Sequence, residues 1–151
     1  MEASPVRVIQ YFDGTKQSLI PLFQRPYTWS KKDWDTLWTD VMAYYAAYNG
    51  SSHFMGAIVS MPARTVPVGV TKFLVIDGQQ RLTTLSLLIA ALRDALQGTP
   101  DEGRLHDYLV NRHYQGADHL KLIPTQGDRE AYRKIIVDRA LPVTVHRIKE
   151  A

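Results

Sequence analysis

The chain is organised around the stretch Val75-Ile76-Asp77-Gly78-Gln79-Gln80-Arg81-Leu82-Thr83-Thr84-Leu85. Its apolar start is typical of a buried strand, the Asp-Gly pair indicates a turn, and the leucines that follow recur at helical spacing. A helix that begins near Gln79 leaves its first backbone N–H groups unpaired at the positive end of the helix dipole. Such N–H groups bind anions, so this stretch predicts phosphate binding where the strand meets the helix.

The residues at this junction suit a phosphate ligand. Gly78 has no Cβ, so it can adopt positive φ and lets a ligand approach the backbone closely. Arg81 carries a permanent charge on a planar fork of donors that matches phosphate oxygens. Asp77 could hold Mg²⁺ through water or orient an attacking water molecule. The same residues also fit an ordinary Asp-Gly turn in which Asp77 only caps the helix.

The composition is that of one globular domain. The 151 residues are 45% hydrophobic and 22% charged, which excludes a collagen-like or disordered chain. A net charge of +3 and a pI near 9.2 permit an anionic partner without requiring one. The chain has no cysteine, which excludes a disulfide framework, a thiolate nucleophile and a cysteine-bound zinc, and its five histidines show no tight metal-binding spacing.

The sequence indicates a cytoplasmic protein that does not interact with membranes. The longest helical apolar stretch, residues 85–92, is too short to span a bilayer, and the N-terminus lacks the layout of a signal peptide. The absence of cysteine fits a reducing compartment. Because the chain stops without a clear final element, we expect residues 1–151 to be a single domain within a longer protein.

A second group of recognition residues lies in the loop Gln24-Arg25-Pro26-Tyr27-Thr28-Trp29. An amide, a guanidinium and two aromatic rings within six residues favour contact with a ligand. The same composition fits a structural loop in which Tyr27 and Trp29 cover the core while Arg25 forms an ion pair. Both interpretations remain open at the level of the sequence.

A helix with a clear start follows this loop. Ser30 and Asp33 resemble a capping box, and an aromatic and aliphatic stripe recurs at helical spacing through Trp34, Leu37, Trp38, Val41, Tyr45 and Tyr48. The stripe predicts a face buried in the core. Lys31 and Lys32 lie in the first turn, where the helix dipole disfavours cations, which hints at an anionic partner.

The remaining elements predict an α+β fold. Strands are expected over residues 18–23, 53–61, 71–76 and 120–123, with the second and third paired antiparallel, and helices over residues 79–97, 100–109 and 128–139. The helix after Asp77-Gly78 is predicted to be the central buried helix, with a thin polar stripe formed by Thr83, Ser86, Arg93, Asp94 and Gln97. Gly56, inside a predicted strand, marks a bulge or a place where another backbone or a ligand comes close.

Two of these motifs together carry a resemblance. Residues 20–29, Ile-Pro-Leu-Phe-Gln-Arg-Pro-Tyr-Thr-Trp, followed by Asp77-Gly78-Gln79-Gln80-Arg81-Leu82-Thr83-Thr84-Leu85, resemble the N-terminal domain shared by GmrSD-type restriction enzymes and phosphorothioate-sensing SspE-type proteins. The resemblance covers roughly residues 8–140. It implies a ParB/sulfiredoxin-like fold, a small mixed sheet packed with helices. It also implies hydrolysis of a nucleoside triphosphate with Mg²⁺, coupled to restriction of phage DNA by a separate C-terminal HNH-type nuclease domain.

The resemblance assigns roles to both motifs. Asp77, Gln79, Gln80 and Arg81 would form the hydrolytic centre, with Asp77 toward metal or water, one glutamine positioning the water, and Arg81 neutralising developing charge. Gly78 and Arg25 would contact the nucleotide. The residues that would bind the DNA are Gln24, Tyr27, Trp29, Lys31 and Lys32. Of the two protein types, we favour the phosphorothioate sensor, so this DNA would carry a phosphorothioate. Two alternatives remain: a non-hydrolytic ParB-like DNA-binding adaptor, and an unrelated small-molecule phosphotransferase.

Overall fold

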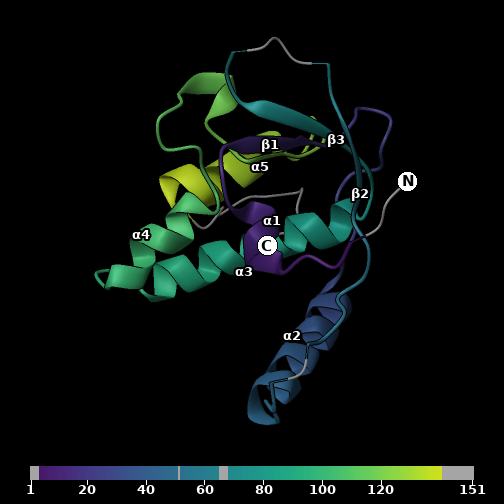
Figure 1. Cartoon of the computed structure of the whole chain (residues 1–151), viewed down its shortest axis with the longest axis vertical. Helices are drawn as coiled ribbons and strands as arrows, with labels where there is room; N and C mark the ends of the chain where they lie inside the picture. Colours follow the sequence, from purple (N-terminus) through teal and green to yellow (C-terminus); the bar gives the residue numbers. More distant parts are fainter. Residues whose placement is uncertain (1–3, 51, 65–67, 141–151) are drawn as a thin grey trace.

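The computed structural model describes residues 4–50, 52–64 and 68–140 and confirms the α+β fold. Four strands form one mixed sheet in the order β2-β3-β1-β4 (Figure 1). The strands are β1 (Lys16–Leu19), β2 (Val59–Pro62), β3 (Thr71–Asp77) and β4 (Leu122–Ile123). Strand β1 runs parallel to both β3 and β4, whereas β2 pairs antiparallel with β3 as the sequence predicts.

The central helix α3 (Gln79–Ala95) begins two residues after the end of β3 and lies along the sheet (Figure 1). Leu82, Leu85 and Ile89 of this helix are buried in the same hydrophobic core as Val75 of β3. The predicted central buried helix is therefore confirmed. Since β3 and α3 are each fixed in the core, the Asp-Gly turn between them has a defined position.

The polar stripe predicted along α3 is exposed only at its carboxyl-terminal end, at Asp94 and Gln97. Thr83, Ser86 and Arg93 are all buried, and the hydroxyl of Ser86 donates to the Leu82 carbonyl at 3.0 Å within the helix. Because a serine or threonine hydroxyl can bond to the preceding turn, burying it leaves no polar atom unsatisfied. Leu92 and Leu96, which the sequence places on the apolar face, are also exposed near the end of the helix.

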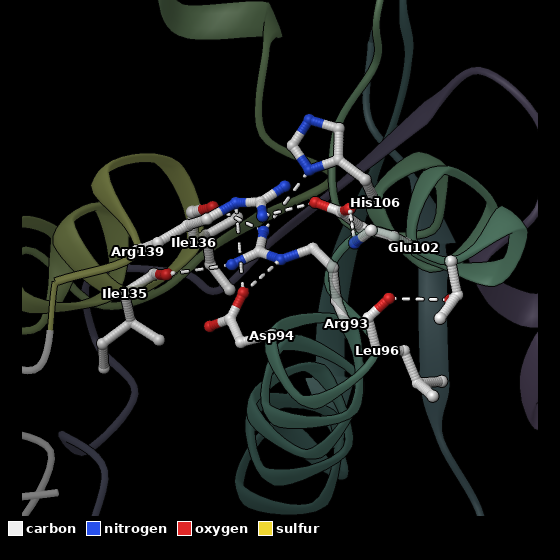
Figure 2. Close-up of polar contacts among 10 residues, drawn as sticks. Arg93, Asp94, Leu96, Glu102, His106, Ile135, Ile136 and Arg139 are labelled. Atoms are coloured by element: carbon white, nitrogen blue, oxygen red, sulfur yellow. Dashed lines mark hydrogen bonds and ion pairs between the residues drawn. The ribbon is translucent and has the colours of Figure 1, made fainter.

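Arg93 anchors the far end of α3 to the rest of the fold (Figure 2). Its guanidinium donates to the carbonyl oxygens of Ile136 at 2.7 Å and Ile135 at 3.3 Å, and to the Asp94 carboxylate at 2.8 Å. It also contacts His106 Nδ1 at 3.3 Å. Burial, and then the charge of Arg93, lower the pKa of His106, so the ring stays neutral and its Nδ1 can accept this hydrogen bond.

Apart from Asp94, the partners of Arg93 come from two other elements, α4 (Pro100–Asp107) and the π-helical turn η2 (Lys134–Asp138). The turn η2 continues the short helix α5 (Arg129–Arg133). Ile135 and Ile136 belong to η2, and His106 belongs to α4. Arg93 thus joins three elements by satisfying backbone carbonyls that the irregular π turn presents.

The predicted core face of α2 (Lys31–Ala46) is wrong. The capping box is present, since the Ser30 N–H donates to Asp33 at 2.7 Å, but none of the helix is buried. Trp38, Tyr45 and Tyr48 are exposed, and α2 extends away from the sheet and from α3 (Figure 1). Trp34, in the first turns, packs against the core. Helical periodicity identifies an apolar side of a helix, but it does not reveal whether anything covers that side.

The boundaries of two strands differ clearly from the prediction. Strand β1 ends at Leu19, and residues 21–24 form a turn, closed by the Gln24 N–H donating to the Pro21 carbonyl at 3.0 Å. Strand β2 starts only at Val59, after irregular residues 52–58. Near the N-terminus, α1 (Val8–Phe12) buries Phe12 and exposes Ile9. A short 3₁₀ turn, η1 (Gly116–Asp118), precedes β4.

Candidate functional site

The amino end of α3 has no side-chain cap. The first hydrogen bond of the helix joins the Leu82 N–H to the Gly78 carbonyl at 2.9 Å, so the N–H groups of Gln79, Gln80 and Arg81 precede the helical ladder. Asp77 accepts the N–H of Gly78 at 2.7 Å and none of these three. The carboxylate of Asp77 therefore closes the turn without capping the helix.

Gly78 is required at this turn for two reasons. Its φ of +89° lies in the left-handed region that side-chain-bearing residues rarely adopt. A Cβ there would also lie 2.9 Å from the Ala57 carbonyl oxygen and 3.2 Å from the Cα of Ile58. The sequence predicts that a ligand comes close to the backbone at Gly78. In the structure, residues 57–58 of the same chain occupy at least part of that space.

Gln80 joins the turn to the recognition loop at residues 24–29. Its side-chain oxygen accepts the Thr28 N–H at 2.7 Å, and its side-chain nitrogen donates to the Pro26 carbonyl at 3.0 Å. Gln24 adds a second link, since its amide donates to the Ile76 carbonyl at 3.1 Å. The two motifs, far apart in the sequence, thus lie against each other. Because both ends of the Gln80 amide are occupied by the loop, Gln80 supports the site rather than presenting a free amide.

Gln79 differs from Gln80 in its surroundings. Within residues 4–50, 52–64 and 68–140 its side-chain amide has no hydrogen-bond partner, although only 8% of the residue is exposed. A polar amide that is nearly buried and unpaired retains its full capacity to bind a water molecule or a ligand. Of the two glutamines, Gln79 is the one whose amide is free to act.

Tyr27 lies in the core, which argues against its predicted contact with DNA. It is 7% exposed, and its hydroxyl contacts Thr84 and accepts from Trp34 Nε1, each at 2.6 Å. Its N–H donates to the buried carboxylate of Asp128 at 2.9 Å. The structural interpretation of the loop therefore applies to Tyr27. Trp29 is also partly buried against the core.

Three exposed cations lie in the loop and in the first turn of α2, and a fourth, Arg64, follows β2. Arg25, Lys31, Lys32 and Arg64 form no ion pair within the part of the chain that the structure describes. The ion pair suggested for Arg25 is thus not seen among the described residues. Cations without partners are available to an anionic ligand.

Sequence reasoning missed two exposed apolar residues beside these cations. Leu22 and Phe23, 71% and 83% exposed, were assigned to a strand but lie in the turn that precedes Gln24. Pro21, which cannot donate a hydrogen bond to a sheet, is the signal that could have placed the end of the strand before them. An exposed pair of large apolar side chains next to polar donors is a feature of binding surfaces.

Arg81 reaches across the turn to the irregular segment before β2. Its Nη1 donates to the Ala57 carbonyl, and its guanidinium lies against Gly56. The side chain is half-buried. The sequence predicts another backbone or a ligand close to Gly56, whereas the structure has the Arg81 side chain there.

A dedicated metal cage is absent from the part of the chain that the structure describes. No three histidine or acidic side chains gather there in a way that could hold a metal ion. The exposed Asp77 carboxylate is a donor of the kind that Mg²⁺ uses when substrate phosphates and water complete its shell. The residues present therefore fit a magnesium ion that arrives with a phosphate ligand.

The fold and the site define an α+β domain in which a strand, an Asp-Gly turn and an uncapped helix present polar groups beside a cationic loop. The model of one family, the N-terminal domain of the GmrSD restriction endonuclease, matches residues 8–149. The chain belongs to this family, and so to the proteins of DNA restriction. Comparison with curated proteins gives no match. None of the helices described is both long and apolar enough to cross a membrane.

Proposed function

We propose that this domain binds a nucleoside triphosphate at the amino end of α3 and hydrolyses it when modified DNA is bound. The hydrolysis would serve a nuclease domain of the same protein that lies outside residues 1–151. Membership in the family of restriction endonuclease N-terminal domains supports the link to DNA. The observation that carries the proposal is the uncapped helix end at Gly78, where backbone donors, Asp77, Gln79 and Arg81 come together.

Each residue at the turn has a proposed role. The N–H groups at the start of α3 and the Arg81 guanidinium bind phosphate oxygens. Asp77 contributes a carboxylate ligand to the Mg²⁺ that accompanies the nucleotide, and that ion supplies charge neutralisation at the phosphates. The free amide of Gln79 orients the attacking water, while Gln80 holds the loop that carries Arg25.

The reading surface for DNA is proposed on the other side of the loop. A phosphorothioate replaces a phosphate oxygen by a larger and less strongly hydrated sulfur, so a reader benefits from an apolar surface next to donors. Leu22 and Phe23 supply exposed apolar area, and Gln24 and Arg25 supply donors. We assign to this surface the DNA-binding role that the sequence predicts for Tyr27, because the Tyr27 ring is buried.

The proposal is tested by measuring GTP and ATP hydrolysis with Mg²⁺ in three conditions: without DNA, with a plain duplex, and with a phosphorothioate duplex of the same sequence. We expect turnover that the modified duplex increases more than the plain one. DNA binding without any hydrolysis would favour the adaptor alternative. Hydrolysis that ignores DNA altogether would favour a small-molecule phosphotransferase.

Phe23→Ala is expected to leave hydrolysis without DNA near the wild-type rate and to remove the preference for the modified duplex. The reason is that the Phe23 side chain is 83% exposed, so its removal takes away surface and should leave the turn that binds phosphate unchanged. Tyr45→Ala removes another exposed aromatic ring, on the part of α2 that extends away from the sheet, and serves as the control. Equal discrimination between the duplexes in both variants would move the reading surface elsewhere.

Lys31→Ala/Lys32→Ala is expected to weaken DNA binding and to flatten its salt dependence. Each phosphate contact contributes about 0.9 to the slope of log K against log salt, so the slope should fall by up to ~1.8. Arg133→Ala/Lys134→Ala removes two adjacent cations that are paired with Asp138 and Glu130, each at 3.0 Å, and is the matched control. Equal losses of slope in the two double variants would refute a specific role for Lys31 and Lys32.

A further inference from the structure

Residues 55–58 form a wall of the site although they lie outside both sequence motifs. They have no regular secondary structure and directly precede β2. The Ala57 carbonyl oxygen faces Gly78, where a Cβ would lie 2.9 Å away, and the same oxygen accepts a hydrogen bond from Arg81. A single peptide carbonyl is therefore in contact with the turn residue and with the proposed phosphate-binding arginine.

Gly56 makes room for the guanidinium of Arg81. A Cβ at Gly56 would lie 2.5 Å from Cζ, 2.7 Å from Nη2 and 2.8 Å from Nε of that side chain. Carbon atoms attached to a backbone do not approach other heavy atoms this closely, so the present position of Arg81 is compatible only with glycine at residue 56. The guanidinium thus lies flat against the backbone at Gly56 while its Nη1 is held by Ala57.

This arrangement uses one edge of the guanidinium and leaves the other free. Nη1 is bonded to Ala57, whereas Nε and Nη2 have no acceptor among the residues that the structure describes. Nε and Nη2 are the pair of parallel donors with which arginine binds two oxygens of a phosphate. Fixing one edge in advance reduces the rotamer entropy that the side chain loses when a ligand binds.

We infer that Gly56 and Ala57 position Arg81, so that its free Nε and Nη2 edge meets the phosphoryl group whose charge develops during hydrolysis. The inference rests on the proposed nucleotide hydrolysis. Gly56 and Ala57 are positioning residues, because they act through Arg81 and not on the substrate. Displacement of a catalytic group by about 1 Å typically lowers the rate about a hundredfold.

The test compares substitutions at two glycines that both have a positive φ. Gly56 has φ +99° and Gly50 has φ +84°, but a Cβ at Gly50 meets no atom within 4 Å. Gly56→Ala is expected to lower kcat about a hundredfold with little change in KM, whereas Gly50→Ala should keep the wild-type kcat. Gly56→Ala with a kcat close to that of Gly50→Ala would overturn the inference.

A double-mutant cycle makes the result independent of whether the domain hydrolyses nucleotide. Gly56→Ala is expected to lower the melting temperature more in the wild-type background than in Arg81→Ala, because removing the guanidinium removes the clash. In Arg81→Ala, Gly56→Ala should also produce no further fall in kcat. Additive effects on the melting temperature would refute the contact. If the wild-type protein shows no hydrolysis, the proposed function is rejected. The melting temperatures of the four proteins in the cycle then still test whether Arg81 lies against Gly56.

Discussion

Arg81→Ala is expected to lower kcat for nucleotide hydrolysis about a hundredfold or more while the folded structure persists. Removing one donor that stabilises developing charge typically raises the barrier by ~2.7–4 kcal/mol. The effect on stability should be small. The hydrogen bond of Arg81 to Ala57 is exposed, so water can replace the lost donor, and such a bond contributes only ~0.5–1.5 kcal/mol. Steady-state hydrolysis and thermal unfolding measured on the same preparation separate the two effects.

Arg129→Ala is the control for this substitution. Arg129 is also an arginine that donates to a backbone carbonyl, that of Pro124 at 3.1 Å, but it lies at the start of α5. It should keep the wild-type kcat while losing a similar amount of stability. If Arg81→Ala hydrolysed nucleotide as fast as Arg129→Ala, the phosphate site proposed at the start of α3 would be excluded.

The elements that the sequence predicted correctly are those set by local signals. The strand ending at Asp77 and the helix starting at Gln79 follow from an apolar run, a glycine that must adopt positive φ, and leucines at helical spacing. The capping box at Ser30 is equally local. Whether α2 is covered depends on partners elsewhere, which is why its aromatic stripe was misassigned to the core.

The candidate site shows the same division between local and long-range information. Its residue types and the strand–turn–helix geometry could be predicted, and the resemblance brought the two motifs together. The contacts that decide each role join distant residues: Gln80 bonds to Pro26 and Thr28, and Tyr27 to Thr84. No periodicity contains such information. The sequence did not assign different roles to the two glutamines. Only these contacts distinguish Gln79 from Gln80.

Buried charge was the hardest feature to predict. Arg93 follows a run of leucines and alanines at a position where helical periodicity predicts solvent, yet it is fully buried. Its burial is possible because the carbonyl groups of Ile135 and Ile136 lie in the last turn of the helix formed by α5 and η2, where they have no donor within the helix and accept from Arg93. The charge is therefore satisfied by a helix end that lies far from it in the sequence.

Arg93→Met is expected to reduce the free energy of unfolding by about 3–5 kcal/mol, because leaving a buried hydrogen-bonding group without its partner costs roughly 1–3 kcal/mol and two carbonyl groups lose their donor. Methionine preserves much of the apolar volume but leaves the carbonyls of Ile135 and Ile136 without their donor. For a domain of this size the melting temperature should fall by roughly 6–20 °C.

Arg139→Met is the matched control for Arg93→Met, because Arg139 lies in the same cluster and binds Glu102 at 2.5 Å on the protein surface (Figure 2). Since a partly exposed ion pair contributes at most ~1 kcal/mol, this variant should unfold within a few degrees of the wild type. Far below the melting temperature, Arg93→Met should still hydrolyse nucleotide at the wild-type kcat, because Arg93 lies at the opposite end of α3 from the proposed site. Equal stability losses in the two variants would show that the burial of Arg93 contributes nothing specific to the fold.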